Sequence, residues 1–380
     1  MNFHPLSARF PSLSFQRKIA LGFCAALISV SRLANGAERP ESPFETTLTP
    51  ATESAGPVIK VKTTKPSSNR YMAFDVVDDT TFDLTGAHIA GSPEHPMQNP
   101  FRAGEQERPP KNIRIIGGVV NGGIPREWNW VLSHAFGGAG FYTVSTGVQV
   151  LEGARIHNVE DGWHPRETPS FKLRSYPNTG RFLMRHCYMT GIRDDCIEND
   201  EFIPGSVEDS LFDGVWTLFS EQNERQGGLF RRVVPTIGPT EDPNIGLTRV
   251  SVRVTSTCGN EPNPGRWFKL IGRESPVHRF IITDCVFATD AEPRSGWRVL
   301  NFPKDATFQG TNYVLWLGKP GAYGAQVPDG SHFLEGQPAK DKWLEVRNKW
   351  LEAHGYAPRS PNDWDPMEAP VEAPRRREGN

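Results

Sequence analysis

Residues 183–195, LMRHCYMTGIRDD, form one unit of the repeat that decides the fold of this chain. The same pattern of short apolar runs and polar corners occurs in VLEGARIHNVEDG at 150–162 and in VEDSLFDGVWT at 207–217. The units are 33 residues apart (Val159 to Ile192) and then 23 residues apart (Ile192 to Val215). Such periods are typical of stacked folds, in which each turn of chain buries its apolar face against its neighbours. The spacing therefore predicts coils of a parallel β-helix.

The pattern extends well beyond these three units. Residues 113–122, 247–254 and 280–287 are short β-like runs of the same kind, and no regular Leu-x-x-Leu-x-Leu frame of a leucine-rich repeat occurs. We therefore expect an all-β fold, a single-stranded parallel β-helix over 58–335, with coils between 112 and 318. Insertions into such a solenoid tend to rise on one face and wall a groove, where we expect substrate to lie. The expected insertions are 123–146, 166–180, 221–246 and 257–266.

The N-terminal region differs from the repeat. Arg17 and Lys18 precede an apolar run at 19–30, which is short for a membrane span and is followed by small residues. This order is typical of a cleaved secretory signal peptide, which we place at 1–37. Residues 38–57 are rich in Pro, Thr, Ser and Glu, a composition that predicts a linker. The sequence thus predicts a secreted or periplasmic protein with no membrane attachment after signal cleavage.

The C-terminal region predicts one helix. Apolar residues recur at i, i+3, i+7 and i+8 within 341–354, and Gly355 follows them. This spacing favours a C-terminal amphipathic helix, for which we allow 336–356, that covers the end or flank of the stack. We expect 357–380 to form a disordered tail.

Composition restricts the partners. With 42 Lys and Arg against 44 Asp and Glu, the net charge is −2, and no nucleic-acid partner is expected. Without the signal peptide four cysteines remain, and three disulfide connectivities stay open beside the alternative of buried free thiols. These cysteines are Cys187, Cys196, Cys258 and Cys285. We expect a monomer.

Asp161, Asp194 and Asp195 are the candidate catalytic residues. Asp161 aligns with Asp194 in the repeat, and equivalent positions of adjacent coils lie about 4.8 Å apart. The three carboxyl groups should therefore form one cluster. Crowded carboxylates raise one another's pKa, so a protonated and an ionised form can coexist, as glycoside hydrolysis requires. The alternative for any single Asp is a corner residue whose side chain bonds to nearby backbone.

Residues beside this trio are candidate substrate ligands. A cationic or imidazole side chain can bind a sugar carboxylate or transfer a proton. A Trp can stack on a sugar ring, although packing inside the protein explains it equally well. The candidate substrate-binding residues are His164, Arg166, Arg193, Trp163, Trp216 and Lys269.

A metal site is a weaker expectation. Glu198, Asp200 and Asp213 extend the acidic surface and would suit Ca²⁺, which takes six to eight oxygen ligands. No His and Cys spacing indicates zinc, and neither a Gly-rich phosphate loop nor a Gly-x-Ser-x-Gly elbow occurs. No cofactor other than Ca²⁺ is expected.

Two resemblances add to these expectations. The run Asp194-Asp195-Cys196-Ile197 resembles the Asp-Asp-Cys segment of polygalacturonase-type hydrolases, and Asn158-Val-Glu-Asp161-Gly162 resembles their preceding Asn-x-Asp element. This resemblance implies the right-handed parallel β-helix of the pectin-lyase-like superfamily, and an inverting hydrolase with Asp161, Asp194 and Asp195 as its catalytic carboxylates. The chain departs from that family at 216–218, where Trp-Thr-Leu replaces Gly-His-Gly, and it lacks the Arg-x-Lys that follows.

Residues 112–352 are more closely similar to a group of secreted bacterial β-helix proteins. Those proteins carry Asp-Asp-x-x-Glu-Asn-Asp and Glu-Asp-Ser-Leu-Phe-Asp-Gly segments, which appear here at 194–200 and 208–214. Their further elements match Trp-Phe-Lys at 267–269 and Val-Leu-Trp-Leu-Gly at 314–318. The group implies a fold and no particular reaction.

Three functions remain open from sequence. The first is a secreted glycoside hydrolase that degrades a polysaccharide. The second is a polysaccharide lyase, in which Lys269 or Arg193 would be the base and the acidic residues would bind Ca²⁺. The third is a non-catalytic carbohydrate-binding or cell-surface protein.

Overall fold

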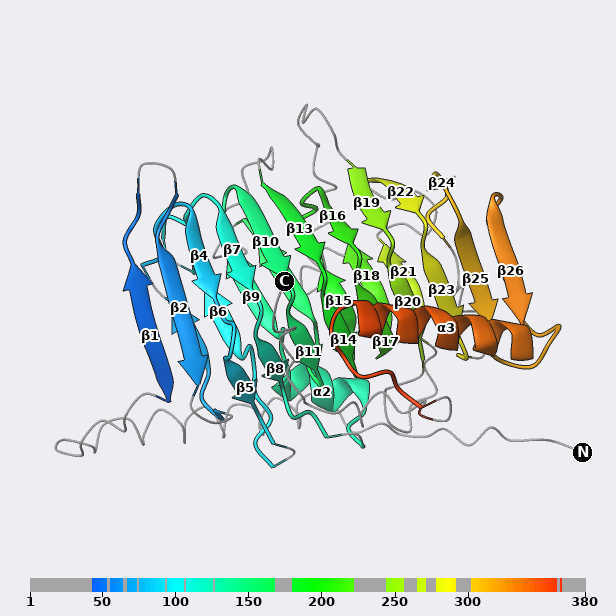
Figure 1. The fold of residues 1–380 in the computed structure, drawn as a ribbon, viewed down its shortest axis with the longest axis horizontal. Coiled ribbons are helices and arrows are strands. Elements are labelled where there is room, and N and C mark those ends of the chain that lie inside the picture. The colour runs from blue at the N-terminus through cyan, green and yellow to red at the C-terminus, as the bar shows by residue number, and fades with distance from the viewer. Residues whose placement is uncertain are drawn as a thin grey trace, which may run out of the picture. The chain divides into compact units, whose positions relative to one another are not determined.

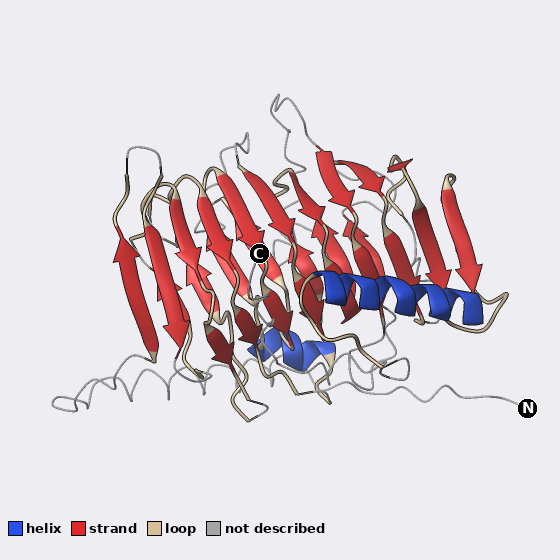
Figure 2. Cartoon of the chain, viewed as in Figure 1, coloured by secondary structure: helices blue, strands red, loops and turns tan. Residues whose placement is uncertain are grey.

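The chain winds repeatedly through three β-sheets, and most coils contribute one strand to each sheet (Figures 1 and 2). The protein is represented by a computed structural model. It describes residues 43–363, except for 53–54, 64–66, 74, 93, 106, 126, 168–179, 222–243, 256–264, 271–277, 292–301 and 361–362.

The strands follow one another in the stack as they do in the sequence. Sheet 1 comprises β1 (Phe44–Thr49), β2 (Val58–Thr63), β4 (Thr80–Asp83), β7 (Ile113–Ile116), β10 (Val148–Glu152), β13 (Arg181–Arg185), β16 (Gly205–Glu208), β19 (Asn244–Thr248), β22 (Arg279–Thr283) and β24 (Thr307–Gln309). Sheet 2 comprises β5 (His88–Ala90), β8 (Val119–Asn121), β11 (Arg155–His157), β14 (Tyr188–Thr190), β17 (Leu211–Val215), β20 (Ser251–Val254), β23 (Val286–Thr289), β25 (Asn312–Trp316) and β26 (Ser331–Glu335). Sheet 3 comprises β3 (Tyr71–Ala73), β6 (Phe101–Ala103), β9 (Phe141–Val144), β12 (Trp163–Arg166), β15 (Asp195–Glu198), β18 (Thr217–Glu221) and β21 (Arg266–Leu270).

The strand register confirms the predicted period. In sheet 1, Val150 of β10 lies opposite Leu183 of β13, which in turn lies opposite Ser206 of β16. These steps are the 33 and 23 residues expected from sequence. Except for β1 against β2, all the strand pairs among the described residues are parallel. The fold is an all-β parallel solenoid, as predicted.

The core is a column of stacked side chains between the sheets. Alternate strand residues point inward, and residues of different sheets meet there: Phe219 of β18 lies against Phe182 of β13 and Phe280 of β22. Fully burying a side chain of this size stabilises the fold by about 1.5–3 kcal/mol. Cys187, Cys196 and Cys285 are free thiols in this interior, in agreement with the buried alternative. Cys258 lies outside the described residues.

The corner between sheets 1 and 2 uses a left-handed backbone in successive coils. Gly153, His186, Asp209, Arg249 and Asp284 occupy this corner with φ values of 66, 55, 40, 52 and 55°. Such a conformation turns the chain from one sheet into the next. Asn, Asp and His adopt it more readily than most residues other than Gly. The side chains at these corners therefore stack along one edge of the solenoid.

Helix α3 (Gln337–Ala353) packs on sheet 2, beside β23, β25 and β26 (Figure 1). It buries Trp343, Trp350 and Leu351 against apolar residues of the sheet, among them Leu315 of β25. Gly355, at φ 80°, ends the helical backbone, because only Gly adopts this conformation without steric cost. The apolar spacing seen in the sequence thus corresponds to a helix that shields the outer face of a sheet.

The two ends of the solenoid differ from expectation. Residues 44–49, inside the predicted linker, form β1, and its antiparallel pairing with β2 covers the first edge of sheet 1. Residues 357–360 and 363, inside the predicted disordered tail, are ordered, and Arg359 is buried. The predicted signal peptide and residues 364–380 lie outside the described residues. Within the described part of the chain, no helix combines the length and apolar character needed to cross a membrane.

Candidate active site

The three candidate catalytic carboxylates meet at the corner that leads into sheet 3. One side-chain oxygen of each of Asp161, Asp194 and Asp195 lies within 4.8 Å of the others. Asp161 precedes β12, and Asp195 begins the next strand of the same sheet, β15. Stacked corners therefore bring together residues that are 34 positions apart in the chain.

The pairing within the trio differs by one residue from the sequence alignment. Trp163 lies opposite Ile197, and the backbone N–H of Asp195 donates to Asp161 Oδ1 at 3.1 Å. Asp161 is thus the neighbour of Asp195, whereas the backbone N–H of Asp194 donates to the carbonyl of Glu160 at 2.8 Å. The corner before β15 holds one residue more than the corner before β12, which shifts the register from 33 to 34.

Lys269 supplies the cation that faces the trio. Its Nζ lies 3.1 Å from Asp194 Oδ1 and 3.0 Å from Asp195 Oδ2. Lys269 stands on β21, two strands beyond β15, and its long side chain reaches back across β18. Burial lowers its pKa, but the two carboxylates outweigh burial and raise the pKa, so Lys269 stays protonated.

Glu198 and His164 form the second half of the cluster. His164 Nδ1 lies 2.8 Å from Glu198 Oε2, and Asp161 shares a side-chain hydrogen bond with Glu198. Burial raises the pKa of Glu198, but His164, Lys269 and the bond from Asp161 lower it to about 2. Burial lowers the pKa of His164, but Glu198 and Asp200 raise it above its usual value. Glu198 is therefore an ionised carboxylate that faces the imidazole of His164.

Asp161 and Asp195 are the carboxyl groups whose pKa is raised. Burial first, and then repulsion from neighbouring carboxylates, raises the pKa of Asp161 well above its usual range. The pKa of Asp195 is also raised by burial and by Asp194, although Lys269 opposes this shift. Asp195 Oδ1 and His164 Nε2 are buried and have no hydrogen-bond partner among the described residues. A buried polar atom without a partner calls for a water or a ligand.

Helix α2 (Trp130–Phe136) brings in residues that the sequence analysis missed. Trp130 Nε1 donates to Asp194 Oδ2 at 2.9 Å, and His134 Nδ1 lies 2.5 Å from Glu160. The hydrogen bond that the His134 ring donates to Glu160 is the main reason why the pKa of His134 is raised. The Asn129 side chain caps the helix, accepting from the backbone N–H of Leu132 at 2.9 Å. In the sequence, only the Asn129 cap and the Trp-x-x-x-His spacing indicate this helix. The insertion lies outside the repeat, so the repeat does not predict where its residues lie.

Two predicted substrate ligands, Arg166 and Arg193, bind other groups of the protein beside the site. Arg166 is buried, 2.9 Å from Glu201 Oε1, and donates to the hydroxyl of Tyr142. Arg193 donates to the backbone carbonyls of Pro125 and Trp128 at 3.1 and 3.0 Å, which fixes the segment leading into α2. Both guanidinium groups are buried and hydrogen-bonded to other groups of the protein, so neither is positioned to contact a sugar directly.

The two tryptophans named in the sequence analysis face the interior. Trp163 is fully buried, and its Nε1 donates to Thr143 Oγ1 at 2.9 Å. Trp216 is also buried, and the Arg266 guanidinium lies over its ring, 5.3 Å from the centroid. Packing, the alternative weighed for these residues, explains both, so neither can be a stacking platform for a sugar in this conformation.

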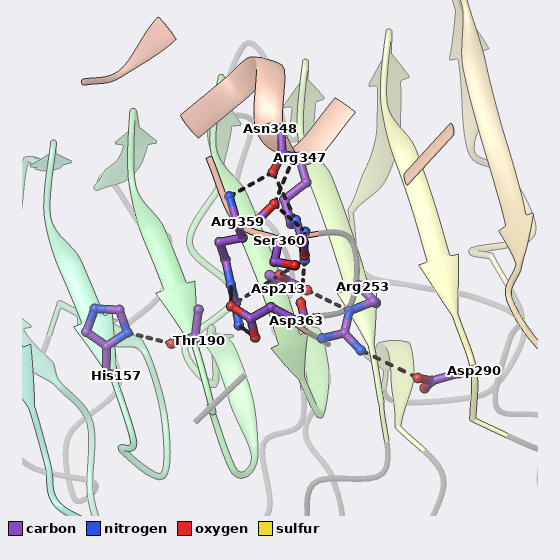
Figure 3. A network of polar contacts seen from close by, with 10 residues as sticks. All are labelled: His157, Thr190, Asp213, Arg253, Asp290, Arg347, Asn348, Arg359, Ser360 and Asp363. Carbon is purple, nitrogen blue, oxygen red and sulfur yellow. Dashed lines mark hydrogen bonds and ion pairs between the residues drawn. The ribbon is translucent and has the colours of Figure 1, made fainter. Parts of the chain in front are cut away.

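The residues proposed for Ca²⁺ do not come together. Glu198 and Asp200 lie near His164, but Asp213 stands on β17 in sheet 2, among Arg253, Arg347 and Arg359 (Figure 3). At the trio, a lysine ammonium is already hydrogen-bonded to two of the three carboxylates. Glu198, Asp200 and Asp213 therefore cannot bind one ion together, because Asp213 lies in another sheet.

The raised pKa of Asp161 predicts how Asp161→Asn changes stability with pH. An unfolded Asp has a pKa of about 3.9. Above that value the folded protein holds a proton that the unfolded chain has released, so the free energy of unfolding falls as pH rises towards the pKa in the fold. Asn imitates the neutral acid and does not ionise. The stability of the variant relative to wild type should therefore increase as pH rises above about 4, until the pKa of Asp161 in the fold is passed.

Urea unfolding at several pH values in this range measures the effect. Asp305→Asn, at an exposed position, is the control and should not change the pH dependence. A constant difference between Asp161→Asn and wild type would show that Asp161 does not hold a proton in the fold.

Comparisons with known proteins contribute no assignment. No protein-family model, curated protein or solved structure matches this chain. The chemistry of the candidate site is therefore argued from its own residues.

Proposed function

We propose that this chain is a secreted, right-handed β-helix enzyme that hydrolyses the glycosidic bonds of an acidic or plant-type polysaccharide. The observation that carries the proposal is a cluster of carboxyl groups within 4.8 Å of one another, next to Glu198. Their surroundings raise the pKa of Asp161 and Asp195 and lower that of Glu198. Glycoside hydrolysis uses such a pair, one group to protonate the leaving oxygen and one to assist attack at the anomeric carbon.

The roles follow from the hydrogen bonds. Asp195 has a buried, unpartnered oxygen and a raised pKa, which suit a proton donor to the leaving oxygen. Asp194 accepts hydrogen bonds from Lys269 and Trp130, which hold its carboxyl group beside Asp195. The glycosidic C–O bond breaks and the leaving oxygen takes the proton of Asp195. The oxygen of water bonds to the anomeric carbon, and the carboxylate of Asp194 takes the proton that this water loses. Asp161 remains hydrogen-bonded to Glu198 and to the Asp195 backbone, which positions the acid.

The stereochemistry of this reaction is a separate question. Retaining glycosidases place their carboxyl groups about 5–5.5 Å apart, and inverting ones about 6.5–9.5 Å apart. The trio, with oxygens within 4.8 Å, is nearer to the first arrangement, whereas the family resemblance implied inversion. The anomeric configuration of the first product, observed by NMR, distinguishes the two, and hydrolysis is common to both.

The same contacts argue against elimination. A lyase needs a base that removes the proton next to a uronate carboxyl group, and a basic Lys must be uncharged to accept it. Lys269 is hydrogen-bonded to two carboxylates, which raise its pKa. Arg193 is committed to two backbone carbonyls. Neither residue is therefore suited to act as the base.

One observation favours binding without turnover as a second candidate. Asp161, Asp194 and Asp195 expose only 7, 3 and 1% of their surface. A reacting sugar needs access to these oxygens, whereas a sugar bound at the rim of the cluster does not.

A panel of neutral and acidic polysaccharides tests these alternatives, read for reducing ends and for ultraviolet-absorbing unsaturated ends. We expect reducing ends to rise on one class of polymer, with no unsaturated ends and no effect of a chelator. Unsaturated ends would replace the proposal by a lyase. If a polymer retards the protein on an affinity gel while neither signal rises, the site binds and does not cleave.

A further inference from the structure

A second cluster of ligand-type side chains lies far from the carboxylate trio, where α3 meets the solenoid. His186 and Asp209 occupy the left-handed corner between sheets 1 and 2 in two successive coils. His354, the residue that ends α3, lies beside them. One ligand atom from each of the three side chains lies within 4.8 Å of the other two.

The distances match those between ligands of one metal ion. His354 Nε2 is 3.4 Å from Asp209 Oδ2, and His186 Nε2 is 3.6 Å from the same oxygen. Zinc binds His nitrogen at about 2.0–2.1 Å and carboxylate oxygen at about 2.0–2.2 Å, so tetrahedral ligand atoms lie about 3.3–3.5 Å apart. Both distances from Asp209 Oδ2 to the histidine nitrogens are close to this value.

The surroundings orient His354 as a ligand. Its Nδ1 lies 2.8 Å from the carbonyl of Trp350, one helical turn earlier, and can only donate to that oxygen, so Nε2 is the ring nitrogen that faces Asp209. Metal-binding histidines usually donate their second N–H in this way. The Trp350 indole stacks on the His354 ring at 3.9 Å and donates to the backbone carbonyl of Asp209 at 3.2 Å. The same helix residue thus fixes two of the three ligands.

We propose that His186, Asp209 and His354 bind a divalent transition-metal ion, with Zn²⁺ the preferred ion, and that this ion joins the end of α3 to two coils of the solenoid. Two imidazoles and a carboxylate are a zinc ligand set, and hard cations such as Ca²⁺ prefer oxygen ligands. The side chains of His186, Asp209 and His354 are 44, 27 and 19% exposed, so an ion can enter and a water can complete its coordination. The ligands are distant in sequence and form no motif, which is why sequence analysis found no zinc site.

Thermal unfolding with Zn²⁺ alone tests the site, using untagged full-length protein. An ion bound only to the folded state raises Tm, and a 100-fold excess over Kd should raise it by about 4 °C at this chain length. His354→Gln, His186→Gln and Asp209→Asn should each remove this rise, and a chelator should reverse it in wild type. His332→Gln, at an exposed position on β26, is the matched control and should keep the rise.

Co²⁺ supplies a readout that is independent of stability. Bound in place of Zn²⁺, it should give visible absorption typical of tetrahedral coordination, one equivalent per chain, and His354→Gln should abolish that absorption. The rise in Tm should persist in an Asp194→Asn/Asp195→Asn variant, which separates this site from the candidate active site. Absence of a Zn²⁺ response in wild type, or a response unchanged in all three ligand variants, would overturn the proposal.

Discussion

Replacing both Asp194 and Asp195 by Asn should reduce the release of reducing ends by at least about 10³-fold, because general acid and base groups each contribute about 10²–10⁴-fold. The double variant removes the proton donor and both carboxylate partners of Lys269. It changes little of the hydrophobic core, which is built from inward-facing residues of all three sheets. The measurement is the initial rate on the polymer that the panel identifies, with circular dichroism to verify the fold.

Two further variants make this result interpretable. Asp305→Asn/Asp329→Asn removes the same charge from exposed positions and should retain full activity. Lys269→Met leaves both carboxyl groups in place but removes their cation, so it should also lower the rate, with a shift in the pH profile that a purely structural defect would not produce. Activity within about tenfold of wild type in the Asn double variant would remove Asp194 and Asp195 from the mechanism.

The fold could be predicted because its determinants are local and periodic. Apolar residues that recur at equivalent inward positions, such as Leu151, Met184 and Val207, mark strands, and the spacing between them gives the repeat. β1 escaped prediction because its strand is nearly all exposed and polar, so it has the composition of a linker. Its order depends on pairing with β2, a contact that composition does not encode.

The trio could be predicted because stacking converts sequence period into proximity. Three further features could not. The exact register at Asp161 depends on one extra corner residue. The contact of Trp130 with Asp194 depends on how an insertion folds. The interior position of Trp163 depends on a corner, where strand alternation is interrupted. Corners and an insertion supply Asp161, Asp194 and Trp130, and they are the parts least determined by period.

Asp213→Asn should lower the free energy of unfolding by about 3–5 kcal/mol, because it leaves buried arginines without their shared anion. Asp213 is fully buried, 2.6 Å from Arg253, 3.3 Å from Arg359 and 3.6 Å from Arg347 (Figure 3). These arginines come from β20, from the segment after α3 and from α3 itself. The carboxylate thus neutralises the cations through which the helix and the C-terminal segment are fixed to sheet 2. Urea unfolding followed by circular dichroism measures the loss.

The partners of the same arginines supply matched controls. Asp290 lies 3.4 Å from Arg253 but is 38% exposed, so Asp290→Asn should cost less than about 1 kcal/mol. Arg253→Met added to Asp213→Asn removes one of the cations that lost this anion, and apolar replacement of a buried pair is often neutral or stabilising. The double variant should therefore recover part of the lost stability, although each single variant is destabilised. Equal losses for Asp213→Asn and Asp290→Asn, or no recovery in the double variant, would mean that packing of α3, and not this buried anion, holds the C-terminal region on the solenoid.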